Sequence, residues 1–139
     1  MIQGNPLKPV IAVTLSSQEL PHLVHWRRMF EGLQDCGAIP LAIDCGGTPI
    51  RISGLLARVD GLILSGGVDV DPTLYGGNRR DPFVQHVDPI RDSNEIEAFE
   101  SARQERIPTL AICRGAHLVN AARAAEPFTP ISPAIVPPM

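Results

Sequence analysis

The sequence predicts an α/β domain built on a parallel sheet. Four short apolar runs, rich in Val, Ile and Leu, alternate along the chain with four segments whose pattern is helical. The apolar runs lack the polar alternation of a half-exposed strand, which is typical of parallel strands covered by helices on both faces. At 139 residues the chain has the length of one domain.

The predicted strands cover residues 9–15 (PVIAVTL), 38–43 (AIPLAI), 61–67 (GLILSGG) and 107–112 (IPTLAI). The predicted helices cover residues 21–37, 48–60, 91–106 and 114–124. Thr48 is a candidate N-cap of the second helix, with Pro49 at its first position. Asp92, three residues before Glu95, predicts a capping box at the start of the third helix.

Composition argues against several classes of function. A formal net charge of −3 is unlike a general nucleic-acid binder, which carries a basic face. No apolar run reaches the length of a membrane span, and the first residues do not form a secretory signal, so no membrane partner is expected. The three cysteines (Cys36, Cys45 and Cys113) are odd in number and lack ligand spacing, which favours reduced thiols in a cytoplasmic protein.

Two segments with residues suited to catalysis follow predicted strands. Functional groups in parallel sheets gather at the carboxyl ends of strands. Cys113 lies at a sharp turn from strand to helix, where the free N–H groups of a helix N-terminus favour a thiolate. The Arg114 N–H is then expected to face an oxyanion formed at Cys113, and the Gly66–Gly67 turn is expected to supply a second donor. The residues alone leave another reading open, in which Cys113 is a small buried side chain that closes a strand.

Four motifs occur together in this chain: GAIPLAI, VDGLILSGGVDVDPTLYG, RDSNEIEAFESARQERIP and LAICRGAHLVN. In this order and spacing they resemble the γ-glutamyl-γ-aminobutyrate hydrolases of the class I glutamine amidotransferase-like superfamily, from about residue 9 to residue 120. The resemblance implies the amino-terminal part of a flavodoxin-like three-layer fold. It implies a cysteine-dependent peptidase-type hydrolase of γ-glutamyl amides, with Cys113 as nucleophile and the Gly67 and Arg114 amides as the oxyanion hole. Gly66 and residue 117 would then contact substrate, and no cofactor is implied.

One position departs from the family pattern, because His117 stands where the family usually has glutamine. A role for His117 as the base is not expected, since it lies about one helical turn beyond Cys113 and reads as a surface or packing histidine. No metal site is predicted. His22 and His25 share a helix face without a third ligand, and Asp69 and Asp71 more often shape a turn than bind a cation.

The family's triad needs a histidine and a glutamate within a histidine–proline–glutamate segment. None of the four histidines here is followed by proline and glutamate, so we expect negligible hydrolase activity from this chain. Residues 124–139 are proline-rich and do not match the family. If the codons for residues 124–132 are translated in the frame that begins at the third base of each codon, they allow the family-like sequence GGTLYPDI. The sequence therefore predicts two parts, residues 1–123 of an amidotransferase-like domain truncated by a frameshift and an out-of-frame tail at 124–139.

Two other functions stay open at this stage. One is a glutaminase module that passes ammonia to a synthetase, and the other is a non-catalytic protein that binds γ-glutamyl compounds or a partner chain. The substrate class implied by the resemblance is a small γ-glutamyl amide. Self-association through exposed apolar surface is also expected, because the missing later elements of the family fold would leave apolar faces bare.

Overall fold

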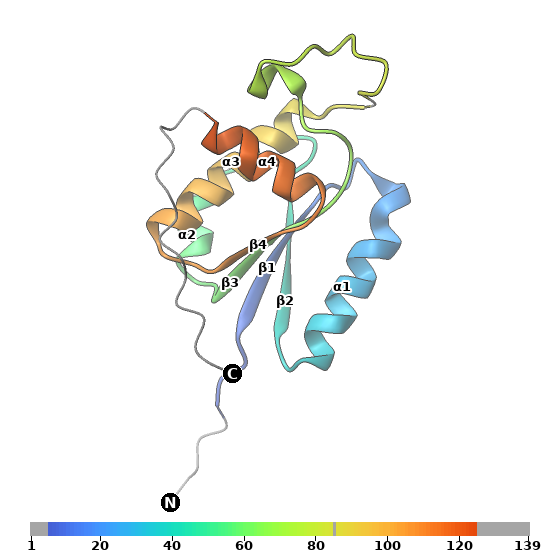
Figure 1. Cartoon of the computed structure of the whole chain (residues 1–139). Helices are drawn as coiled ribbons and strands as arrows, with labels where there is room; N and C mark the ends of the chain where they lie inside the picture. The colour runs from blue at the N-terminus through green and yellow to red at the C-terminus, as the bar shows by residue number, and fades with distance from the viewer. Residues whose placement is uncertain (1–5, 85, 125–139) are drawn as a thin grey trace, which may run out of the picture.

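The computed structural model describes residues 6–84 and 86–124 and has a four-stranded parallel sheet at its centre (Figure 1). The strands are β1 (Val10–Leu15), β2 (Ile39–Asp44), β3 (Gly61–Leu64) and β4 (Thr109–Ala111), in the order β2-β1-β3-β4. All three pairings are parallel, so the α/β prediction is confirmed. The carboxyl ends of β1, β3 and β4 therefore meet at one edge of the sheet.

The helices are α1 (Leu23–Asp35), α2 (Ser53–Leu56), α3 (Pro89–Gln104) and α4 (Arg114–Arg123). Two short 3-10 helices, η1 (Leu20–His22) and η2 (Pro72–Tyr75), lie in the loops after β1 and β3. Figure 1 shows α1 alone on one side of the sheet, with α2, α3 and α4 on the other side. The layers therefore match a flavodoxin-like arrangement, as the motifs predict.

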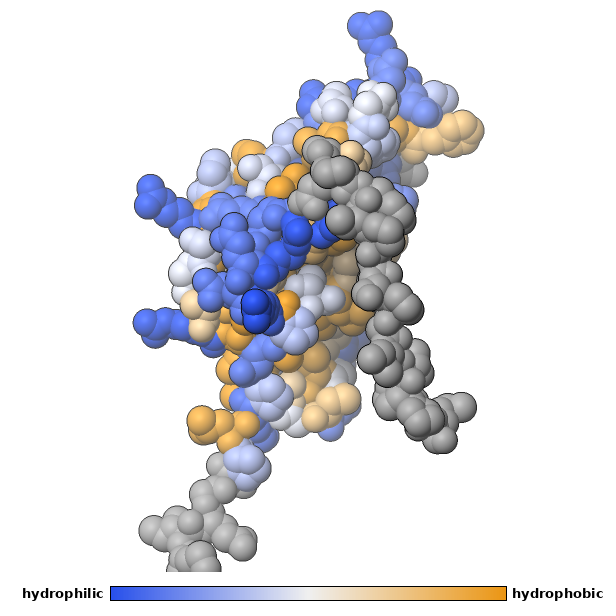
Figure 2. Space-filling model, turned by 60° about the vertical axis from the view of Figure 1, so that its left-hand side comes forward, coloured by the Kyte–Doolittle hydropathy of each residue, from blue (hydrophilic) through white to orange (hydrophobic). Residues whose placement is uncertain are grey.

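The main core lies between the sheet and the layer of α2, α3 and α4. Leu62 and Leu64 of β3 point into this layer and pack with Leu56, Ala98 and Leu118, all fully buried or nearly so. Every residue of β3 is buried, which explains why its sequence shows no polar alternation. The outer surface on this side carries hydrophilic and apolar side chains side by side (Figure 2).

The opposite face of the sheet is covered unevenly. The register aligns Val13, Ile63 and Leu110 in one row across β1, β3 and β4. Their exposed fractions rise from 0% and 8% to 57% along that row. Helix α1 thus covers the β1 end of the row and leaves the β4 end accessible, so the expected cover on both faces holds for only part of the sheet.

Two predicted helix starts are wrong. Helix α2 begins at Ser53, because the Asn94 side chain accepts from the Ile50 N–H and donates to the Thr48 carbonyl. These bonds hold residues 48–50 as a loop, so Thr48 is not an N-cap. Helix α3 begins at Pro89 and is capped by Asp88, whose carboxylate accepts from the Arg91 N–H at 3.0 Å.

Asp92, the residue expected to cap α3, instead lies inside that helix and is buried. The dipeptide Asp88–Pro89 combines a preferred N-cap residue with a preferred first helical residue, so it was the better signal in the sequence. Residues 125–139, the greater part of the predicted tail, lie outside the described residues.

A close approach between α4 and β3 depends on Gly115. A Cβ at this position would collide with the Leu64 backbone carbonyl and with the Leu64 Cβ, 2.9 Å away. We expect Gly115→Ala to lower the free energy of unfolding by about 1–3 kcal/mol, because the backbone of a buried strand cannot move aside. Gly54→Ala is the matched control, since its Cβ meets open space within α2 and should be neutral or slightly stabilising. Equal urea midpoints for the two variants would contradict this packing argument.

The apolar surface at β4 generates a second prediction, which concerns self-association. Leu110 is 57% exposed, and Ile112, two residues further along the chain, is 37% exposed. We expect sedimentation velocity to show concentration-dependent association that Leu110→Asp reduces, because a charge on this surface opposes burial. Leu74→Asp, an exposed leucine in η2, serves as the control that leaves association unchanged. A single monomeric species at every concentration would show the prediction to be wrong.

Candidate active site

Cys113 sits at the junction of β4 and α4 in a conformation rare for a side-chain-bearing residue. Its φ is +52° and its ψ is −111°, and its thiol is exposed. Holding such a residue in this region costs on the order of 1–3 kcal/mol, which the surrounding structure must offset. The observed geometry matches the strand-to-helix elbow that the sequence predicts for Cys113.

The backbone around Cys113 is fixed from both sides. The Ile112 N–H donates to the Leu64 carbonyl at 2.9 Å, and the Gly115 N–H donates to the Ile112 carbonyl at 2.9 Å. The Arg114 N–H is the first of α4, so it has no partner inside its own helix. This N–H and the positive end of the helix dipole lie directly after the thiol-bearing residue.

The glycine loop after β3 faces Cys113. A Cβ added to Gly66 would lie 3.7 Å from the Cys113 Cβ, so Gly66 and Cys113 are neighbours in space. Ser65, which precedes the loop, is buried, and its hydroxyl donates to the Thr14 carbonyl and accepts from the Trp26 Nε1–H at 2.9 Å. The sheet thus brings together the two segments that the sequence singles out.

Two cavities flank the thiol. One is lined by Gly67, Asp69, Tyr75 and His117 together with Cys113. The other lies toward α1, and is lined by His22, His25, Trp26, Met29, Gly66, Gly67, Ile112 and Cys113. Cys113 and Gly67 belong to both cavities. A substrate in either cavity would therefore lie beside the nucleophile candidate and the glycine loop.

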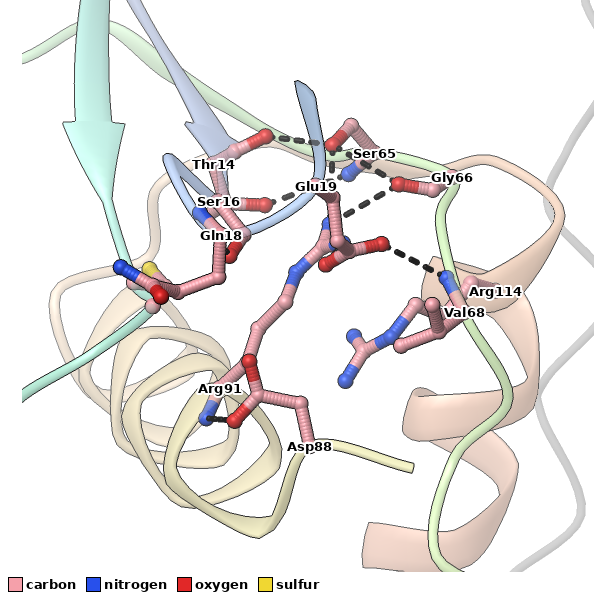
Figure 3. A network of polar contacts seen from close by, with 12 residues as sticks. Thr14, Ser16, Gln18, Glu19, Ser65, Gly66, Val68, Asp88, Arg91 and Arg114 are labelled. Atoms are coloured by element: carbon pink, nitrogen blue, oxygen red, sulfur yellow. Dashed lines mark hydrogen bonds and ion pairs between the residues drawn. The ribbon is translucent and has the colours of Figure 1, made fainter. Parts of the chain in front are cut away.

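A buried ionic cluster lies behind the glycine loop (Figure 3). Arg91 pairs with Glu19 at 2.6 Å and with Glu95 at 3.2 Å. Arg114 pairs with Glu95 and with Asp92. The side chains of these five residues are between 0% and 7% exposed. Removing one partner of a buried pair of this kind typically costs about 3–5 kcal/mol.

The pKa values of Asp92 and Arg91 are both raised within the cluster, for different reasons. Burial raises the pKa of Asp92 above its usual range, although the nearby Arg114 opposes the shift. Burial lowers the pKa of Arg91, but Glu95 and Glu19 outweigh it and raise that pKa overall. Arg91 is therefore a permanent cation, held by carboxylates on two different segments of the chain.

A family model described as peptidase C26 matches residues 9–132 of the chain. The chain belongs to the peptidase C26 family. Its relatives include "Putative glutamine amidotransferase PB2B2.05" of Schizosaccharomyces pombe, 40% identical over 81% of the chain and 41% of that protein. They also include "Gamma-glutamyl-gamma-aminobutyrate hydrolase PuuD" of Escherichia coli K12, 33% identical over 80% of the chain and 39% of that protein. The chain thus spans about two fifths of the length of these relatives.

The peptidase C26 match confirms the family that the four motifs predict, and the structure brings the predicted residues together. Cys113, Arg114 and Gly67 line one cavity, and Gly66 lines the adjoining one. His117 is exposed on α4 and lines the same cavity as Cys113. Whether these residues act on substrate stays a prediction.

Sequence reasoning missed Glu19 and underestimated Arg91, both of which touch the glycine loop of this peptidase C26 domain. No local signal marks Glu19, since it is one acid in a short loop and its partner lies 72 residues away. The spacing of Arg91 and Glu95 at i and i+4 did carry a signal for an ion pair on α3. Its burial was not foreseeable from that spacing.

All three cysteines are free thiols, and burial raises the pKa of Cys45 far above its usual range. Within residues 6–84 and 86–124 no group of three or more His, Cys, Asp or Glu side chains is arranged to hold a metal ion. Over the same residues no helix has the length and apolar character that a membrane crossing requires.

Asp71 shapes the loop after β3, as the turn reading of this aspartate predicts. Its carboxylate accepts from the Thr73 N–H and hydroxyl and pairs with Arg79. The Arg79 guanidinium holds the pKa of Asp71 well below its usual range, against the effect of burial. The loop that carries Asp69 and Tyr75 into the cavity is therefore anchored by an ionised carboxylate.

The shift at Asp71 gives a prediction about pH. A depressed folded-state pKa stabilises the fold above the unfolded value of about 4, and this stabilisation is lost as pH falls below it. We expect Asp71→Asn to lower the free energy of unfolding by about 1–2 kcal/mol at pH 7, because Arg79 is half exposed and partly screened. The difference should shrink below pH 4 in urea titrations.

The control for this experiment is Asp81→Asn in the same segment, where the exposed carboxylate bonds only the Phe83 N–H among the described residues. It should change stability little at either pH. A difference between wild type and Asp71→Asn that is constant from pH 7 to pH 3 would exclude the ionised carboxylate as the source of the stabilisation.

Proposed function

We propose that this peptidase C26 domain provides the nucleophile and oxyanion hole of a cysteine-dependent hydrolase of γ-glutamyl amides. The observation that carries the proposal is Cys113 at an elbow of positive φ, with the Arg114 N–H directly after it and Gly66 of the glycine loop beside it in space. In this reaction the Cys113 sulfur attacks the γ-carbonyl carbon and a C–S bond forms. The carbonyl electron pair moves to oxygen, where the Gly67 and Arg114 amides stabilise it.

The cavity beside Cys113 supports the substrate class. Asp69 and Asp81 both line it, and carboxylates there suit the α-ammonium group of a γ-glutamyl compound. Gly66 and His117 complete the surface around the thiol, and we assign them to substrate contact. The E. coli relative named as a γ-glutamyl-γ-aminobutyrate hydrolase agrees with this class.

The second half of the reaction needs a group that protonates the leaving amine and activates water. The 139 residues contain no histidine followed by proline and glutamate, the segment that carries the family's triad base. Losing such a base costs on the order of 10⁶ in turnover in a comparable hydrolase. We therefore propose that the 139-residue chain by itself is acylated by activated substrates and has negligible turnover of γ-glutamyl amides.

The test compares a γ-glutamyl active ester with the matching acetyl ester and reads acylation of Cys113 by mass spectrometry. We expect faster γ-glutamyl transfer than acetyl transfer, no adduct at position 113 in Cys113→Ser, and no measurable release of γ-aminobutyrate from its γ-glutamyl amide. Turnover at the 1–10³ s⁻¹ of ordinary enzymes would overturn the proposed inactivity. Equal rates for the two esters would overturn the substrate class.

The relatives named as glutamine amidotransferases favour a second candidate, a glutaminase-type site. The same experiment separates the two functions, because a glutaminase site should be protected from γ-glutamyl transfer by free glutamine more strongly than by γ-glutamyl-γ-aminobutyrate. Binding of either compound without any acylation of Cys113 would instead favour a non-catalytic binding protein.

We also propose that the protein is cytoplasmic. We further propose that the change of pattern after Arg123 results from a shift of the reading frame. The support is the family-like sequence GGTLYPDI that the shifted codons of residues 124–132 allow. Sequencing the coding DNA from codon 115 past the stop tests it. A shifted frame that encodes a histidine–proline–glutamate segment agrees with the frame shift, and a shifted frame that closes at once contradicts it.

A further inference from the structure

The oxyanion hole proposed above needs an N–H, and not a carbonyl, directed from the glycine loop toward Cys113. Two adjacent glycines, Gly66 and Gly67, form this loop, and glycine gives a peptide plane the freedom to rotate. The orientation of the plane between them must therefore be set by contacts from outside the loop.

Arg91 makes the first of these contacts. Its Nη2 donates to the Gly66 carbonyl at 2.9 Å, from the interior side of the loop (Figure 3). The described peptide bonds are all trans, and in a trans peptide the C=O and N–H of one plane point in opposite directions. The Gly67 N–H therefore points away from the Arg91 guanidinium and stays free of it.

Glu19 makes the second contact, on the next peptide plane. Its Oε1 accepts from the Val68 N–H at 2.8 Å, while its Oε2 pairs with Arg91 Nη1 at 2.6 Å. The Val68 N–H is thus turned inward, toward the same ion pair that holds the Gly66 carbonyl. One buried pair fixes two consecutive peptide planes of the loop.

The fit between the loop and the ion pair leaves no spare room. A Cβ at Gly67 would collide with Arg91 Nη1 and lie 2.6 Å from Glu19 Oε1. The Arg91 side chain is 0% exposed, and its Nε bonds to Glu95 while its Nη2 also bonds to the Ser65 hydroxyl. The pair is therefore rigid where it touches the loop.

We infer that Glu19 and Arg91 are positioning residues that hold the Gly66–Gly67 peptide with its N–H available to the oxyanion at Cys113. This inference rests on the proposed function, because it assigns the pair to the same oxyanion hole. Neither side chain touches substrate in this role. Without the pair, the peptide is free to rotate and to present the Gly66 carbonyl, which repels an oxyanion.

The test separates acylation from alkylation of the same thiolate. With p-nitrophenyl acetate, a C–S bond forms, the carbonyl pair moves to oxygen, and collapse expels p-nitrophenolate, which leaves as an anion and needs no acid. With iodoacetamide, the sulfur displaces iodide at carbon and no oxyanion forms. Both reactions need the thiolate. The rate constant of acylation divided by that of alkylation therefore does not depend on the thiolate fraction, and it reports the contribution of the oxyanion hole.

Mass spectrometry reads the ratio at Cys113 and, in the same sample, at Cys36, an exposed thiol at the end of α1 with no glycine loop assigned to it. We expect Glu19→Gln and Arg91→Lys to lower the Cys113 ratio by up to about 100- to 1,000-fold, the range for loss of an oxyanion donor. The Cys36 ratio should stay constant. Arg103→Lys, which alters the half-exposed pair with Glu100, is the matched control and should change neither ratio.

Three outcomes decide between the claims. If the unaltered protein shows equal ratios at Cys113 and Cys36, the oxyanion hole itself is absent and the proposed function fails together with the inference. If the Cys113 ratio is high and stays high in folded Glu19→Gln and Arg91→Lys, only the positioning role is wrong. Should Arg91→Lys fail to fold by circular dichroism, the near-isosteric Glu19→Gln decides alone.

Discussion

The Arg91 guanidinium is the contact on which the arrangement around Cys113 depends. It lies where the loops after β1 and β3 meet α3, and it bonds to all three through Glu19, the Gly66 carbonyl and Glu95. A parallel sheet brings strand ends together, but it leaves the polar groups of their loops to be satisfied by something else. A planar cation with five donors in a fixed geometry suits that task better than a flexible ammonium group.

The same cluster links the nucleophile elbow to the glycine loop. Glu95 bonds to both Arg91 and Arg114, and Arg114 follows the nucleophile candidate directly. Two guanidinium groups are matched by three carboxylates, and the pKa of Asp92 is raised mainly by burial, with the negative charge of Glu95 adding to the shift. Because these groups are buried, their charges interact more strongly than surface pairs of the same geometry would.

Much of this architecture follows from local patterns in the sequence. Continuous apolar runs predict buried parallel strands, and an ICRG segment after such a run predicts the elbow at Cys113. The start of α3 had a local signal, Asp88–Pro89, which the capping-box pattern of Asp92 and Glu95 obscured. The start of α2 and the role of Asp92 depend on side chains distant in sequence, such as Asn94 for the loop at Thr48. A local pattern cannot show which long-range partner satisfies a backbone group, so Glu19 had no signal at all.

The position of Trp26 has a practical consequence. The chain contains one tryptophan, its indole N–H bonds to Ser65 next to the glycine loop, and its ring lies under the Arg91 guanidinium with the Cζ 5.7 Å from the ring centroid. All indole fluorescence therefore originates within the site, in contact with its central cation. The emission wavelength and quenching of the unlabelled protein report the hydration and electric field at that one place, without an added probe.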